Sequence, residues 1–68
     1  MSFEKRVLDT VSKVLQNDNS ASFTYGTLFV ACAENEARKL FHKLSKEYGS
    51  GKVQIAGPIQ GEYAYDFI

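Results

Sequence analysis

The chain has 68 residues, enough for one domain whose core protects a smaller share of its surface than the core of a larger protein does. A single cysteine, Cys32, excludes a disulfide framework, and one cysteine with one histidine, His42, is too small a set for a zinc site. Eight basic and eight acidic residues cancel, so any attraction to nucleic acid has to be local.

The first predicted element is a helix over residues 2–16. Ser2 stands at the N-cap position, where its hydroxyl can accept a hydrogen bond from a free amide of the first turn. The segment 17–20, Asn-Asp-Asn-Ser, favours turns and predicts a loop after the helix. The apolar residues of the helix recur at the spacing of one helical face, and they are Phe3, Val7, Leu8, Val11, Val14 and Leu15.

The next segment, 22–32, predicts a strand because it is rich in β-branched and aromatic residues. Gly26 is typical of a bulge or bend within it. Apolar residues occur on both faces near its end, and such a strand is normally covered on both sides. Alternation places Phe23, Tyr25, Thr27, Phe29 and Ala31 on one face and Thr24, Leu28, Val30 and Cys32 on the other.

A second helix is predicted over residues 34–48, with acidic residues near its start and basic residues after them, as the helix dipole favours. Gly49-Ser50-Gly51 predicts its end, because glycine accepts the backbone angles of a C-cap. Residues 52–56 predict a half-buried strand, and residues 57–61 predict a turn. Residues 62–68 alternate aromatic and polar side chains, so the last two strands are expected to form a hairpin.

These elements predict an α+β fold in the order α-β-α-β-β, a two-layer sandwich with two helices on one face of a three-stranded mixed sheet. The second face of that sheet is left without cover. If Leu28 and Val30 point to the helices, then Phe23, Tyr25 and Phe29 lie on the open side. The opposite choice exposes Leu28, Val30 and Cys32, so apolar area is left over either way.

We therefore expect a small non-enzymatic interaction module that self-associates, with a dimer favoured. Phe23, Tyr25 and Phe29 are the candidate contact residues, because exposed apolar patches on small proteins usually mark interfaces. A sheet edge offers a second route to the same end, since unpaired amides and carbonyls can extend the sheet into another copy. Residues 23–25 are the predicted edge.

The alternative hypothesis is a nucleic-acid-binding accessory protein. It depends on a basic strip on the second helix, diluted by glutamates, whose members are Arg38, Lys39, Lys43 and Lys46, with His42 between them. A related hypothesis is an aromatic platform on the sheet, on which bases would stack. Such a platform needs basic residues around it, which this sheet lacks, and aromatic residues of this kind more often belong to the core or to an interface. Its members would be Phe23, Tyr25, Phe29, Tyr63, Tyr65 and Phe67.

No catalytic, cofactor or metal site is predicted. Cys32 precedes the second helix, whose N-terminus would lower the pKa of a thiol, but no base is nearby in sequence, and burial explains most free cysteines. His42 is read as a solvated side chain. The turn at 57–61 lacks the lysine and the following helix of a phosphate loop.

The cellular setting follows from weaker signals. Charged residues in the first turn and the lack of a following apolar run argue against a signal peptide. The longest apolar stretch, 28–33, is far shorter than the roughly 20 residues that cross a bilayer, so no membrane span is expected. A lone thiol suits a reducing compartment, which predicts a cytoplasmic protein. Shortness and lack of motifs also suit an orphan protein of a bacteriophage.

Overall fold

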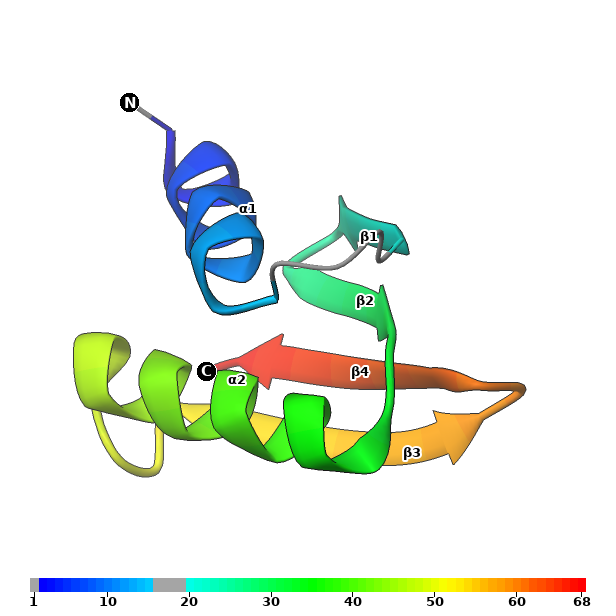
Figure 1. Ribbon diagram of the computed structural model, residues 1–68. Helices are drawn as coiled ribbons and strands as arrows, with labels where there is room; N and C mark the ends of the chain where they lie inside the picture. Colours follow the sequence, from blue (N-terminus) through cyan, green and yellow to red (C-terminus); the bar gives the residue numbers. More distant parts are fainter. Residues whose placement is uncertain (1, 16–19) are drawn as a thin grey trace.

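The computed structural model describes residues 2–15 and 20–68. Two helices and a four-stranded antiparallel sheet make an α+β fold (Figure 1). The predicted loop at 17–19 lies outside the described residues. The elements in chain order are α1 (Phe3–Val14), β1 (Ser20–Thr24), β2 (Thr27–Ala31), α2 (Glu34–Tyr48), β3 (Val53–Ile59) and β4 (Glu62–Phe67).

Both predicted helices are confirmed. Ser2 is the N-cap of α1, and its hydroxyl accepts a hydrogen bond from the Lys5 amide at 3.2 Å. The second helix has the predicted bounds, and Gly49 is its C-cap with a φ of 111°, an angle that glycine adopts without a steric penalty. Neither helix of the described chain is long and apolar enough to cross a membrane.

The predicted strand over 22–32 is instead a hairpin of two strands. Tyr25 and Gly26 form its two-residue turn, with φ values of 52° and 78°. Positive φ at both central residues is the geometry that matches the twist of the flanking strands. The bend expected at Gly26 is therefore a full reversal of the chain. As a result Phe23 pairs with Leu28 and shares its face of the sheet.

The second hairpin is confirmed, but its first strand is longer than predicted. β3 runs on through Gly57 and Pro58 to Ile59, and Gln60-Gly61 alone makes the turn. One extra residue is accommodated between Ala56 and Ile59, where the register of pairing with β4 shifts. The predicted turn residues 57 and 58 therefore form a β-bulge inside the strand.

The sheet order is β1-β2-β4-β3, and every neighbouring pair is antiparallel. The predicted order α-β-α-β-β and the three-stranded mixed sheet are therefore wrong, while the α+β class holds. The order and the strand count differ because the turn at Tyr25 and Gly26 divides the predicted strand in two, and the sheet is antiparallel because β4 lies between β2 and β3. The crossover through α2 consequently joins two strands that are parallel in direction but are not neighbours.

The two halves of the chain repeat one arrangement, a helix followed by a hairpin. β1 and β3 are the outer strands, and β2 and β4 pair at the seam between the halves. The two hairpin turns also match, because Gln60 and Gly61 have φ values of 52° and 81°. An approximate twofold axis therefore relates the halves and passes near the Phe29–Ala64 pair.

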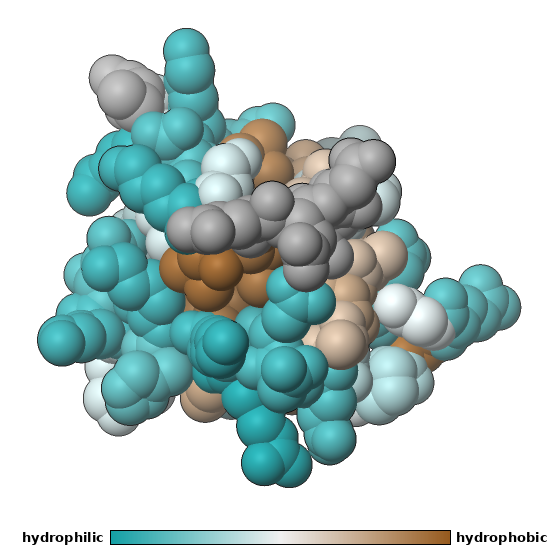
Figure 2. Space-filling view, in the orientation of Figure 1, coloured by the Kyte–Doolittle hydropathy of each residue, from teal (hydrophilic) through white to brown (hydrophobic). Residues whose placement is uncertain are grey.

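The core lies between the helices and one face of the sheet. Figure 1 shows α2 along β3 and β4, with α1 next to the first hairpin. In Figure 2 the surface over the helices is largely hydrophilic, with hydrophobic side chains visible between them. The buried apolar side chains form one cluster, with members Val7, Val11, Leu15, Leu28, Val30, Ala37, Leu40, Leu44, Val53, Tyr63 and Tyr65.

Tyr65 is the largest of the fully buried side chains. Its hydroxyl donates a hydrogen bond to the carbonyl of Ala37 at 2.8 Å, which ties β4 to α2. Burial, with smaller contributions from Cys32 and Tyr63, raises the pKa of this phenol above its ordinary value. Tyr65 is therefore neutral and serves to anchor the sheet to the helix.

Candidate functional site

The outer edge of β3 carries backbone groups that nothing in the described chain pairs with. The Ile68 amide donates to the Lys52 carbonyl at 2.8 Å, so Lys52 directs its carbonyl toward β4, while its amide donates to the Gly49 carbonyl at 3.0 Å. Backbone direction alternates along an antiparallel strand. Val53 and Ile55 therefore direct their amides and carbonyls away from β4, and β3 is the last strand of the sheet.

This edge lacks the charges that normally protect an exposed strand. Residues Val53–Ile59 include no charged side chain. Natural edge strands are usually kept from pairing by lysines, prolines or bulges. Here Pro58 and the bulge limit pairing at the end of the strand, and the first four residues have no such device. Two large apolar side chains are also exposed on β3, Ile55 at 38% and Ile59 at 64%.

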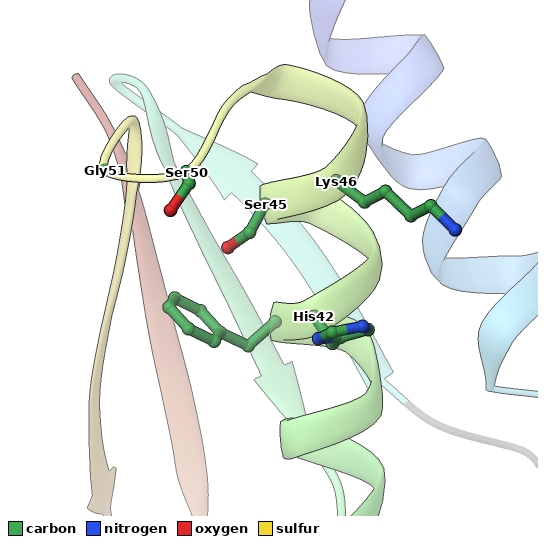
Figure 3. Close-up of a pocket in the computed structure, with 6 residues that line it drawn as sticks. His42, Ser45, Lys46, Ser50 and Gly51 are labelled. Atoms are coloured by element: carbon green, nitrogen blue, oxygen red, sulfur yellow. The ribbon is translucent and has the colours of Figure 1, made fainter.

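A pocket of about 520 Å³ lies beside this edge, between α2 and the turn that leads into β3. It is on the flank of α2 that faces away from α1, since Thr10 of α1 hydrogen-bonds Glu47 on the other flank at 3.2 Å. In Figure 3 the side chains of Ser45 and Ser50 face each other across this space. The lining residues are Phe41, His42, Ser45, Lys46, Ser50 and Gly51.

The chemistry of the pocket is apolar and hydroxylic. Figure 3 shows Lys46 extending to the other side of the helix, away from Ser45 and Ser50. The cationic group therefore does not converge with the hydroxyls on a common point. An anion or a reacting group would need such convergence. Together the pocket and the edge of β3 form a surface that consists of a strand edge, the ring of Phe41 and the hydroxyls of Ser45 and Ser50.

The face of the sheet opposite the helices is open, but it is less apolar than predicted. Phe29 is half-buried at its centre, between Ser22 of β1 and Ala64 of β4. Glu62 and Asp66 are the charged residues of the strands on this face, and the Thr27 hydroxyl hydrogen-bonds the Asp66 carboxylate at 2.7 Å. Phe29 and Ile59, the cross-strand partner of Glu62, are the large apolar side chains of the strands on this face. Isolated apolar side chains in an acidic and polar setting are ordinary for a solvated sheet face.

The three residues predicted for self-association lie on three different surfaces. Phe23 faces the helices, where its ring centroid is 5.9 Å from that of Phe3 and the same distance from that of Phe67. Tyr25 is fully exposed at the tip of the first hairpin. Phe29 remains on the open face. The structure therefore does not bring these residues together, because the turn at Tyr25 reverses the chain between them.

The predicted basic strip is partly neutralised. Lys39, His42 and Lys46 are exposed along one side of α2, and no ion pair of theirs occurs in the described part of the chain. The other two strip residues are paired within the helix, Arg38 Nη2 with Glu34 Oε1 at 3.4 Å and Lys43 Nζ with Glu47 Oε1 at 3.9 Å.

The aromatic platform is not formed on the open face. Tyr63 and Tyr65 are buried against the helices, and Phe67 packs on Tyr48 with ring centroids 5.8 Å apart. Bases cannot reach rings that lie between the sheet and the helices. Cys32 is half-buried, and burial together with the nearby Glu36 raises the pKa of its thiol. Its reactivity is lowered accordingly.

The edge of β3 is the surface that sequence reasoning missed. The sequence did contain a signal, because residues 53–59 run without a charge. Among the described residues no group of three potential metal ligands is present. No protein-family model, no curated protein and no solved structure matches the chain.

Proposed function

We propose that the protein is a small non-enzymatic interaction module that self-associates through its sheet. The observation that supports this most directly is the uncharged outer strand β3 with exposed Ile55 and Ile59. Such a strand in a single copy is a template for pairing with another chain. Association with a partner also adds proportionally more stability to a short chain than to a long one, because the core of a short chain is small. A lone thiol suits a reducing compartment, and a cytoplasmic location is part of this proposal.

Sedimentation velocity over a range of micromolar concentrations tests the proposal. The weight-average mass should approach twice the mass of one chain as concentration rises, because self-association follows mass action. The sedimentation profile should remain unchanged in high salt, since the contact proposed here is apolar and backbone-mediated. A mass equal to one chain at every concentration would contradict the proposal.

A nucleic-acid-binding accessory role is the second candidate, favoured by the exposed row of Lys39, His42 and Lys46. Fluorescence anisotropy with labelled single- and double-stranded oligonucleotides at low salt measures it. With two unpaired lysines per copy, the logarithm of the binding constant should fall with the logarithm of salt concentration with a slope of about 2.

This second candidate is tested with variants that remove either a lysine without an ion pair or an arginine that pairs with a glutamate. Replacing Lys39 and Lys46 with glutamine should remove most of the binding at low salt, because each phosphate contact contributes through counterion release. Arg38→Gln removes a cation that already has a partner in Glu34, so its effect should be smaller. Undetectable binding of the unmodified chain would end this candidate.

A further inference from the structure

We propose that two copies of this chain pair through their β3 strands, antiparallel about a twofold axis near Ile55, to form one continuous sheet. This inference rests on the proposed self-association and names its surface. The occupant of the β3 edge is then a second copy of the same edge. The two α2 helices lie side by side on one face of the joined sheet.

The backbone of β3 is complementary to itself in this arrangement. The backbone amides and carbonyls of Val53 and Ile55 point outward. This follows from the Lys52–Ile68 hydrogen bond, because backbone direction alternates from one residue to the next. With Ile55 opposite Ile55 of the second copy, the outward amide of each Ile55 lies opposite the outward carbonyl of the other, and Val53 lies opposite Gly57 at the start of the bulge. An isologous contact of this kind uses one surface twice and closes the assembly at two copies.

The absence of charge on β3 makes this edge a better site for a symmetric contact than the open sheet face. A twofold axis places a surface patch against a copy of the same patch, so a patch with charges of one sign meets charges of that sign. The open face would bring Glu62 and Asp66 of one copy against the same carboxylates of the other. The strand Val53–Ile59 carries no charge, so the edge meets no such repulsion.

The other edge of the sheet fits a second copy less well. Three of the five side chains of β1 are small polar groups exposed to solvent, Ser20, Ser22 and Thr24. The apolar Phe23 of β1 is directed to the helices and packs on other rings there. β3 is also the longer edge, and Ile55 on its helix side is 38% exposed.

The pocket beside β3 supplies the remaining contact area. Neighbouring strands lie about 4.8 Å apart and packed helices lie about 8–10 Å apart, so pairing of β3 with its copy brings the second α2 next to the first. Phe41 and Ser45 line the pocket on that flank. A standard interface buries about 800 Å² per partner, roughly a sixth of the 4620 Å² surface of one copy. An interface of that size has to include the α2 flank as well as the strand edge.

Sedimentation equilibrium on Ile55→Lys is the decisive experiment. The half-exposed side chain leaves room for lysine in one copy, whereas the axis would place two ammonium groups side by side. We expect the dissociation constant of the dimer to rise by at least about 100-fold, since like-charge contacts across interfaces are strongly unfavourable. Thr24→Lys adds the same charge to the other edge strand, and Phe29→Ser removes the ring of the open face. Both should dimerise as the unmodified chain does.

The outcomes distinguish pairing through β3 from self-association through another surface. A monomeric unmodified chain removes both. A dimer that survives Ile55→Lys overturns the edge pairing while self-association stands, and a dimer lost on Phe29→Ser assigns the contact to the open face. Hydrogen exchange of the Val53 and Ile55 amides provides a measurement without a variant. Their protection should rise with protein concentration, and protection independent of concentration would overturn the inference.

Discussion

Replacement of Tyr65 with alanine is expected to leave the chain largely unfolded at room temperature. Tyr65 is 0% exposed and belongs to the core cluster. Large-to-small substitution of a buried aromatic residue costs about 3–5 kcal/mol, because apolar contacts are lost and a cavity remains. A chain this short rarely has more than about 3–5 kcal/mol of stability from its own core. The loss is therefore comparable to the whole margin.

Urea denaturation followed by circular dichroism measures this loss, with Tyr65→Phe as the matched control. Phenylalanine keeps the ring in the core and removes the hydrogen bond from the Tyr65 hydroxyl to the Ala37 carbonyl. That single bond is worth about 1 kcal/mol, so Tyr65→Phe should fold with a lowered midpoint. A cooperative transition of Tyr65→Ala at a midpoint similar to that of Tyr65→Phe would show that this ring is not central to the core.

Gly57→Ala is expected to have the second large effect. Gly57 has a φ of 121°, where side chains are strained, and a Cβ there would lie 2.8 Å from the Glu62 carbonyl oxygen. The same Cβ would lie 3.3 Å from the Cα of Tyr63. Both neighbours are backbone atoms of β4, so relief requires the two strands to move apart. We expect a loss of about 3 kcal/mol or more, from backbone strain and overpacking together.

The control for this substitution is Gly61→Ala in the following turn. Gly61 also has a positive φ, 81°, but nothing lies within 4 Å of its ideal Cβ. The cost there is confined to the left-handed backbone, about 1–2 kcal/mol. Thermal unfolding of both variants gives the comparison. Equal losses for the two substitutions would mean that the close approach at the bulge does not constrain the hairpin.

The helices were predictable because their signals are local. The apolar spacing lies within each helix, and Ser2 and Gly49 directly adjoin the helices that they cap, so the predicted bounds of α2 match the structure. The hairpin at Tyr25 was not predictable in the same way. A tyrosine with a φ of 52° is uncommon, since bulky residues avoid the left-handed region. Alternation of apolar residues continues across the turn and conceals it.

The misplacement of the predicted contact surface follows from that turn. Within one strand Phe23 and Leu28 would face opposite sides, because their positions differ by an odd number, five. A two-residue turn between them makes them partners on one face. The order of strands in a sheet also cannot be read from local sequence patterns, so the sequence did not reveal that residues 53–59 form an outer edge. The uncharged composition of that segment became informative once its place in the sheet was known.

The approximate twofold relation between the halves has a consequence for the kinetics of folding. Each hairpin pairs strands that are separated by two residues, so closing it costs little chain entropy. Proteins rich in such short-range pairings fold fast. Among the described strands, β2 with β4 is the pairing that joins the halves. We therefore expect the pairing of Phe29 with Ala64 to belong to the later step, the one that joins the two halves.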